Sequence, residues 1–130
     1  MKTKRFVFDT NSLISALILP SSVSRIPLKK ADELGILVFS KETLDELNEV
    51  IIRSKFDKYV TLEDRLEYIQ RLEARGEIIK TSSVFTDCRD KKDNKFLNLA
   101  YDGKASCIIT GDQDLLILNP FQQIEIISSA

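Results

Sequence analysis

Short apolar runs alternate with helix-like stretches along the whole chain, and this alternation limits the possible folds more than any other feature. The runs at residues 5–8, 36–39, 106–109 and 124–127 have the length and the polar or glycine boundaries of buried strands. Strands that alternate with helices form βαβ units, in which helices cover both faces of a parallel sheet. The sequence therefore predicts an α/β fold with a central parallel sheet, in a single domain over residues 1–130.

Capping residues, apolar spacing and chain-breaking residues place the helices. Ser40 and Thr61 each suit the start of a helix, Pro20 is expected to stop the first helix, and Gly76 suits the end of another. The helix that starts near Thr61 has a predicted apolar face made of four residues, Leu62, Leu66, Ile69 and Leu72. Besides the helices that start at Ser40 and Thr61, we expect helices at residues 12–19, 24–34, 93–102 and 115–118 and a short strand at residues 78–79.

Composition excludes several classes of protein. Hydrophobic residues make up 43% of the chain and charged residues 30%, which is typical of a globular cytosolic protein. The chain has no apolar stretch of the length that a signal peptide or a membrane span needs, so we expect a cytoplasmic protein. The chain contains 0 histidines, and this excludes Ser-His-Asp catalysis, Cys-His catalysis and a zinc site built from imidazole. The formal net charge of -1 gives no overall attraction to nucleic acid, so a polyanionic partner would need a local basic patch or a bridging metal.

Aspartates directly follow two of the predicted strands. Asp9 comes after residues 5–8, and Asp112 and Asp114 lie just after residues 106–109. In open α/β sheets, ligands bind in the crevice at the carboxyl ends of the strands. Two carboxylates in one short turn raise each other's pKa unless a cation lies between them. The pattern therefore predicts an acidic site at this sheet edge that suits a hard divalent cation.

Asp9 and Asp93 also have a purely structural interpretation as helix caps. Asp9 suits the start of the following helix, although Asn11 could cap that helix while Asp9 binds an ion. Asp93 suits the start of the helix at residues 93–102, in a solvated charged loop. The basic residues beside Asp93 could instead meet phosphates; they are Lys91, Lys92 and Lys95.

Glu46 has a structural interpretation of its own. Thr43 and Glu46 have the spacing of a capping box, which would make Glu46 part of a helix start. Ser40 offers an earlier cap, which would place Glu46 in the second turn of the helix. Because Asp45 and Glu49 are also acidic, position alone does not choose the residue that would face the site.

Four segments together resemble a known family, the PIN domain ribonucleases, which include the toxins of many bacterial and archaeal toxin–antitoxin pairs. The order, spacing and length of the segments agree with that family over almost the whole chain. The segments are Val7-Phe8-Asp9-Thr10-Asn11, residues 40–50 around Glu46, Asp93-Asn94-Lys95-Phe96-Leu97-Asn98-Leu99-Ala100, and Ile109-Thr110-Gly111-Asp112-Gln113-Asp114-Leu115-Leu116. The resemblance implies a three-layer α/β/α PIN-like fold.

The resemblance also implies which residues form the site. The family's acidic and polar positions fall on Asp9, Glu46, Asp93 and Asp112, with Asp114 near the same pocket and Asn11 and Thr110 as supports that fix the carboxylates. The implied cofactor is Mg²⁺ or Mn²⁺, which bridges phosphate oxygens and lowers the pKa of a bound water. Asp9 and Asp112 would be the most direct ligands, and Asp93 a ligand or water-positioning carboxylate. Glu46 would orient or deprotonate the water, although the roles of Glu46 and Asp93 could be exchanged.

The implied function is metal-dependent hydrolysis of phosphodiesters in RNA. The implied partners are the RNA substrate, an antitoxin protein if the chain is a toxin, and a second copy of the chain in a homodimer. Two alternatives stay open. A phosphoacceptor receiver domain is also an α/β domain with Mg²⁺ at acidic strand ends, but its first strand normally precedes adjacent acids, where this chain has Asp9 followed by Thr10-Asn11. A catalytically silent PIN-like domain would bind RNA or protein without cleavage.

Overall fold

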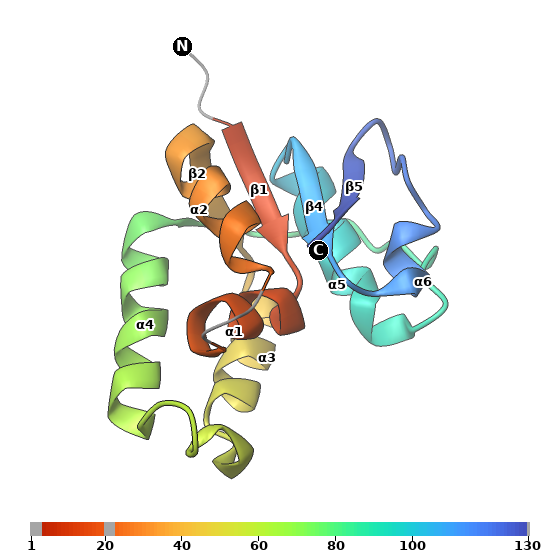
Figure 1. Ribbon diagram of the computed structural model, residues 1–130. Coiled ribbons are helices and arrows are strands. Elements are labelled where there is room, and N and C mark those ends of the chain that lie inside the picture. Colours follow the sequence, from red (N-terminus) through yellow and green to blue (C-terminus); the bar gives the residue numbers. More distant parts are fainter. Residues whose placement is uncertain (1–3, 20–22, 130) are drawn as a thin grey trace.

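The computed structural model describes residues 4–19 and 23–129 and contains a parallel sheet of five strands in the order β3-β2-β1-β4-β5 (Figure 1). The strands are β1 (Lys4–Phe8), β2 (Gly35–Phe39), β3 (Glu77–Ile78), β4 (Cys107–Thr110) and β5 (Glu125–Ser128). The α-helices are α1 (Thr10–Ile18), α2 (Arg25–Leu34), α3 (Lys41–Ile51), α4 (Leu62–Arg75), α5 (Asn94–Asp102) and α6 (Gln113–Leu116). Two 3₁₀ turns, η1 (Ser54–Phe56) and η2 (Lys91–Asp93), precede α4 and α5. Pro20, the predicted stop of the first helix, lies outside the described residues.

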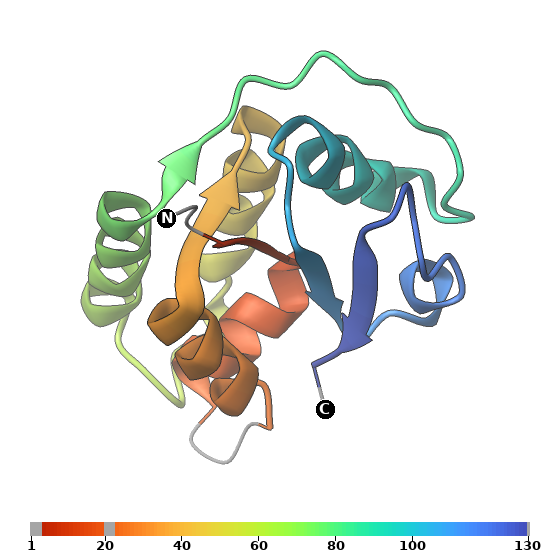
Figure 2. The same ribbon diagram turned by 90° about the horizontal axis from the view of Figure 1, so that it is seen from above.

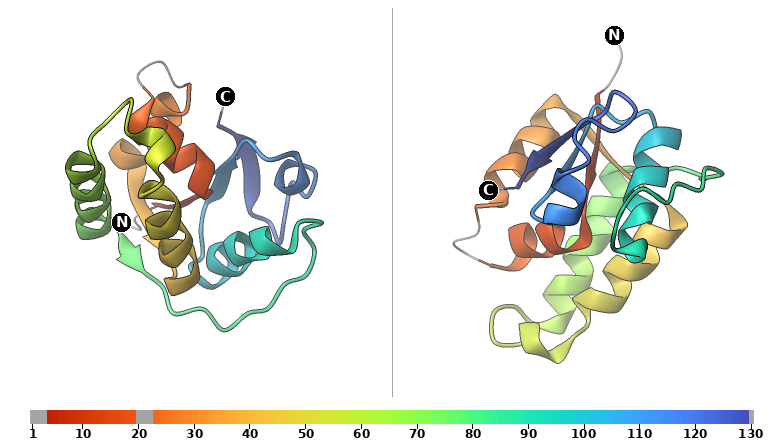
Figure 3. Two further views of the ribbon diagram at one scale, coloured as in Figure 1. Left: turned by 90° about the horizontal axis from the view of Figure 1, so that it is seen from below. Right: turned by 90° about the vertical axis from the view of Figure 1, so that its right-hand side faces the viewer.

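Helices cover both faces of the sheet. Successive residues of a strand point to opposite faces, so neighbouring residues of β1 pack in different cores. Phe6 and Phe8 of β1 pack in a core with residues of α1, α3 and α4. Val7 between them packs in a second core with residues of α5 and α6. Figure 3 shows α3 and α4 side by side, and Figure 2 shows residues 79–90 arching along the outside between β3 and α5. The predicted three-layer α/β/α fold is therefore confirmed.

Helices α1, α3 and α4 each begin at a residue whose side chain caps them. The capping side chains and the residues whose backbone amides donate to them are Asp9 with Ser12, Ser40 with Thr43 and Thr61 with Asp64. Asp9 therefore caps α1, and the alternative cap at Asn11 is wrong. Ser40 and Thr43 form a complete capping box at the start of α3, so a box that begins at Thr43 and ends at Glu46 is wrong too.

The predicted apolar face of α4 is only partly correct. Ile69 and Leu72 are buried in the core, but Leu62 and Leu66 are 45% and 41% exposed. The fully buried side chain in this half of the helix is Arg65. The amino-terminal half of α4 therefore faces something other than the apolar core.

The guanidinium of Arg65 explains this orientation. It donates to the backbone carbonyls of Ile51 at 3.1 Å and Arg53 at 2.9 Å, and it forms a hydrogen-bonded ion pair with Asp57. Because these acceptors belong to the end of α3 and the turn before α4, they compensate the burial of the charge. Arg65 thus joins α3, η1 and α4 through polar contacts.

The junction of α2 and β2 requires glycine because two strands come very close there. A Cβ added to Gly35 would lie 2.0 Å from the carbonyl oxygen of Lys4 in β1.

Ser24 stands at the predicted start of α2, but its side chain makes no capping hydrogen bond. Cys107 of β4 is buried. In the described part of the chain, no helix is both long and apolar enough to cross a membrane.

Candidate active site

A cavity of about 240 Å³ lies at the carboxyl ends of β1 and β4 and is lined by five acidic residues, which are the four predicted acids and Asp90. Each of the four predicted acids comes from a different part of the chain. Asp9 follows β1, Glu46 lies in the second turn of α3, Asp93 ends η2 just before α5, and Asp112 follows β4. The fold thus gathers around one space the four acids that the sequence keeps far apart. We call this space the acidic cavity.

Asp9 is both a helix cap and a lining residue of the acidic cavity. The residue is only 6% exposed, and its Oδ1 accepts from the backbone amide of Ser12 at 2.9 Å while its Oδ2 accepts from Thr110 Oγ1 at 2.6 Å. The Thr110 hydroxyl also accepts from the backbone amide of Asp112 at 3.0 Å. A carboxylate offers about four lone-pair positions, so these two bonds leave Asp9 able to accept more. The structural and functional interpretations of Asp9 are therefore compatible.

Glu46 reaches across from α3 to two other helices. Its Oε2 accepts a hydrogen bond from Thr10 Oγ1 at 2.8 Å in α1 and lies 3.1 Å from Lys95 Nζ in α5. The side chain of Lys95 is only 21% exposed, so this ion pair is partly shielded from water. These two contacts hold the Glu46 carboxylate at the acidic cavity and leave Oε1 without a partner among the described residues.

Asp93 and Asp112 come into direct contact. Burial, a side-chain hydrogen bond to Asp112 and the negative charges of Asp112, Asp90 and Asp9 raise the pKa of Asp93 from 3.8 to about 7. Asp93 occupies the N-cap position of α5, as its structural interpretation predicts, but its side chain makes no capping hydrogen bond. Asp112 does cap a helix, since its Oδ1 accepts from the backbone amide of Asp114 at 2.9 Å. The charge cluster therefore retains a proton near neutral pH.

Two further predicted residues have different positions. The Asp114 carboxylate lies 3.6 Å from Arg89 Nε, and Asp114 does not line the acidic cavity in the described part of the chain. Asn11 lines the acidic cavity, and its exposed side chain has no hydrogen-bond partner among the described residues. Asn11 is thus available to a ligand rather than engaged with a carboxylate.

Sequence reasoning missed the contacts that hold Glu46 and the basic rim of the acidic cavity. Thr10 and Glu46 are 36 positions apart, and no sequence pattern links two residues at that spacing. Arg53 and Lys92 line the acidic cavity together with the carboxylates, and only the run of lysines near Asp93 pointed to such a rim. Guanidinium and ammonium groups beside carboxylates suit a ligand that carries its own negative charge.

The donor set fits a hard divalent cation. Carboxylate, hydroxyl and amide oxygens are the ligands that Mg²⁺ and Mn²⁺ prefer, and Mg²⁺ needs only one or two carboxylates directly. Burial and the neighbouring carboxylates raise the pKa of Asp93, so the acidic cavity disfavours a further negative charge that a cation would offset. Among the described residues, however, no three acidic or cysteine side chains are arranged as a ready-made metal-ligating group. Fewer direct ligands, completed by water, fit this arrangement.

A parallel α/β sheet with a carboxylate-lined cavity at its edge defines the general class of protein. The chain belongs to the PIN domain family, which matches residues 5–114. PIN domains are generally nucleases. Because family membership accounts for the fold and the acidic cavity together, the receiver-domain alternative is not supported.

Three proteins illustrate the similarity. The uncharacterized protein MJ1680 of Methanocaldococcus jannaschii is 39% identical over 116 residues, which cover 88% of this chain and 74% of that protein. The crystal structure of VapBC2 from Rickettsia felis, bound to a DNA fragment from its promoter, has a TM-score of 0.62 at 15% identity and covers 95% of this chain and 98% of that chain. PAE2754 of Pyrobaculum aerophilum has a TM-score of 0.60 at 12% identity, with 97% of this chain and 84% of that chain covered. At such low identity, the two solved structures support the fold alone.

Proposed function

We propose that this protein is a metal-dependent endoribonuclease whose active site is the acidic cavity. The observation that carries the proposal is the convergence of Asp9, Glu46, Asp93 and Asp112 on one cavity at the sheet edge. The raised pKa of Asp93 supports it, because a carboxylate cluster that retains a proton near pH 7 is a cluster that a cation would stabilise. Membership of a nuclease family supports the reaction class.

Each acid has a distinct role in the proposal. Asp9 and Asp112 would be the most direct ligands of Mg²⁺ or Mn²⁺. Asp93 would be a third ligand or would position a water. Asp114 would approach the cation only if its contact with Arg89 opened. The bound cation would polarise the phosphodiester and lower the pKa of a water. Glu46 would accept a hydrogen bond from the attacking water through Oε1, while Thr10 and Lys95 hold the opposite oxygen. Thr110 fixes the orientation of Asp9.

The basic residues at the acidic cavity support a polyanionic substrate. Arg53 and Lys92 line the same cavity as the four acids, so they would bind phosphates on either side of the one that is cleaved. A net charge of -1 makes such local contacts necessary. RNA as the substrate follows from the family resemblance.

We further propose that the chain acts in the cytoplasm as the toxin of a toxin–antitoxin pair and that it forms a homodimer. The first part follows from the family resemblance, and VapBC2, which was solved bound to a DNA fragment from its promoter, is an example of the same fold. An antitoxin would then be the protein partner. A search beside the gene for a small antitoxin-like reading frame, followed by co-expression and co-purification of its product, tests the pairing.

Cleavage of a mixed RNA pool tests the activity. We expect cleavage with Mg²⁺ or Mn²⁺, none with EDTA, and none with Asp112→Asn. Asp87→Asn is a matched control, because Asp87 is exposed in the loop before η2 and lines neither the acidic cavity nor its rim. Cleavage that persists in EDTA, or that Asp112→Asn leaves unchanged, contradicts the proposal. Binding of RNA without any cleavage would favour the catalytically silent alternative.

A further inference from the structure

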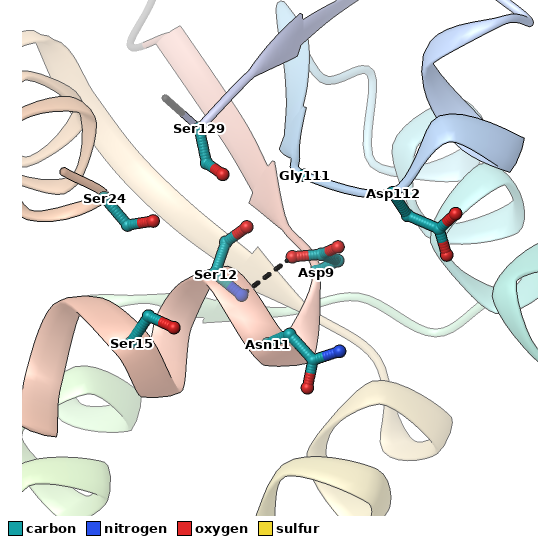
Figure 4. A pocket seen from close by; sticks show the side chains of 8 residues that line it. All are labelled: Asp9, Asn11, Ser12, Ser15, Ser24, Gly111, Asp112 and Ser129. Carbon is teal, nitrogen blue, oxygen red and sulfur yellow. Dashed lines mark hydrogen bonds between the residues drawn. The ribbon is translucent and has the colours of Figure 1, made fainter. Parts of the chain in front are cut away.

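A second cavity adjoins the acidic cavity and is lined mainly by serines. It has a volume of about 310 Å³, and we call it the serine cavity. Its lining residues are Asp9, Asn11, Ser12, Ser15, Ser24, Gly111, Asp112 and Ser129 (Figure 4). Three of these residues, Asp9, Asn11 and Asp112, also line the acidic cavity. The two cavities therefore meet at the proposed position of the cleaved phosphodiester.

Two largely buried serines line the serine cavity. Ser12 is 4% exposed and Ser129 is 7% exposed, and among the described residues no fully buried side-chain oxygen or nitrogen lacks a hydrogen-bond partner. Figure 4 shows that the hydroxyls of Ser12, Ser24 and Ser129 are directed toward a common space. A serine hydroxyl can donate one hydrogen bond and accept others. Hydroxyls that face a common cavity therefore suit a ligand that forms hydrogen bonds.

The wall beside Ser129 is kept open by the absence of a side chain. A Cβ added to Gly111 would lie 3.3 Å from Ser129 Oγ, which is a tight contact. Gly111 lies between Thr110 and Asp112, so the opening is directly beside the proposed metal ligands. A group bound in the serine cavity would therefore contact the reacting phosphodiester.

The chemistry of the lining selects the kind of ligand. No lysine or arginine among the described residues lines the serine cavity, and Asp9 and Asp112 are at one end, so a phosphate group is disfavoured there. The described lining residues include no aromatic ring, so stacking of a base is not the mode of binding. Serine hydroxyls and the Asn11 amide both donate and accept hydrogen bonds. The lining thus suits an uncharged group with several donors and acceptors.

We propose that the serine cavity binds the uncharged nucleoside part, base and ribose, of the nucleotide next to the cleaved phosphodiester. This inference rests on the proposed ribonuclease function. The volume of about 310 Å³ is at the lower end of the range for small-molecule pockets, roughly 300–1,000 Å³. The phosphate backbone then continues into the acidic cavity, where Arg53 and Lys92 are present. The serine hydroxyls read the polar edges of the nucleoside and make cleavage depend on its identity.

Binding of nucleosides without phosphate tests the serine cavity independently of catalysis. Adenosine, guanosine, cytidine and uridine are titrated into the full-length protein, and the backbone amide signals of Ser12, Gly111 and Ser129 are followed by NMR. We expect at least one nucleoside to shift these signals. Ser12→Ala and Ser129→Ala each remove one hydroxyl with little risk to folding, and each should weaken binding about tenfold.

Filling the cavity is the second arm of the test. Ser15 is half-buried on α1 and lines the serine cavity, so Ser15→Leu should abolish nucleoside binding. Ser106→Leu makes the same chemical change at an exposed position outside both cavities and should bind like the wild type. If no nucleoside shifts the signals, or if Ser15→Leu and both alanine variants bind like the wild type, the inference is wrong.

Mapping of RNA cleavage sites separates the inference from the proposed function. If the wild type cleaves RNA, Ser15→Leu should lose its nucleotide preference at the cut by at least about tenfold while its cleavage still requires the metal. Unchanged preference and rate in Ser15→Leu would overturn the serine cavity and leave the ribonuclease standing. Nucleoside binding without any RNA cleavage would overturn the ribonuclease and support the serine cavity as a nucleoside site.

Discussion

Thr110 Oγ1 lies 2.6 Å from Asp9 Oδ2, and this buried hydrogen bond joins residues that are 101 positions apart in the chain. It ties the carboxyl end of β4 to the carboxyl end of β1. The same hydroxyl accepts from the backbone amide of Asp112 at 3.0 Å. One fully buried side chain thus orients two of the proposed metal ligands relative to each other.

Thr110→Val removes this hydroxyl and keeps the shape of the side chain. We expect metal-dependent cleavage to fall by roughly 10–100-fold, because Asp9 loses the donor that orients it. The free energy of unfolding should fall by about 1–3 kcal/mol, since the buried Asp9 oxygen loses its partner. Thr110→Ser retains the hydroxyl and is the control for both measurements. Equal cleavage by the valine variant and the wild type would show that Asp9 needs no such support.

Glu46→Gln distinguishes a site residue from a helix residue. The capping box of α3 is formed by Ser40 and Thr43, so the change leaves the helix start untouched. Glutamine still accepts hydrogen bonds from Thr10 and Lys95 but lacks the negative charge. We expect a large loss of cleavage with an unchanged circular dichroism spectrum. Glu49→Gln, at an exposed position of the same helix, should retain full activity. Equal rates for the wild type and Glu46→Gln would remove Glu46 from the site.

The raised pKa of Asp93 makes the metal-free protein less stable as pH rises. The pKa is 3.8 ordinarily and about 7 in the folded protein, so between these values the folded state holds a proton that the unfolded chain has released. The contribution of Asp93 to stability is therefore greatest at acidic pH and is lost as pH rises to about 7. Asp93→Asn has no charge to titrate. In EDTA at about pH 8, it should melt at a higher temperature than the wild type, and the difference should shrink at about pH 5.

Asp112→Asn tests the other member of this pair. Asparagine can still cap α6, so the change removes the charge without removing the cap. We expect a higher metal-free melting temperature for this variant as well. If Asp93→Asn and Asp112→Asn both melt below the wild type in EDTA, these aspartates are structural hydrogen-bond acceptors and the charge cluster is not a metal site.

Added Mg²⁺ should reverse the order of stability. A cation that binds only the folded state stabilises it by mass action, by about 2.7 kcal/mol at a concentration of about 100 times the Kd. The wild type should therefore gain more in melting temperature from excess Mg²⁺ than Asp93→Asn or Asp112→Asn gains. Thermal melts with EDTA and with Mg²⁺ measure both effects. The same response in all three proteins would argue against these residues as ligands.

Arg65→Leu should destabilise the fold far more than a surface substitution. The change leaves the carbonyls of Ile51 and Arg53 without their donor, and we expect a loss on the order of 2–4 kcal/mol in the free energy of unfolding. Arg71→Leu on the same helix removes only an exposed pair with Glu67 and should cost less than about 1 kcal/mol. Urea unfolding measures both. Equal losses would show that the buried guanidinium is not a stabilising connection.

Much of the fold followed from local patterns. The strands, the helix starts at Ser40 and Thr61, the helix end at Gly76 and the helix end at residue 102 agree with expectation, because periodicity and capping depend on residues a few positions apart. The apolar face of α4 was misjudged, because only tertiary contacts could show that Arg65 has acceptors for its buried charge.

The type of fold and the aspartates after β1 and β4 can be predicted from the sequence, since strand ends and their polar neighbours are local features. The interactions among the acids depend on the tertiary structure. The bonds of Glu46 with Thr10 and Lys95, the contact of Asp93 with Asp112 and the raised pKa all depend on distances between segments that are remote in the chain. The serine cavity likewise arises where α1, the start of α2 and the end of β5 meet. Hydrogen bonding and electrostatic coupling act over a few ångströms in space, and sequence spacing does not encode such distances between remote segments.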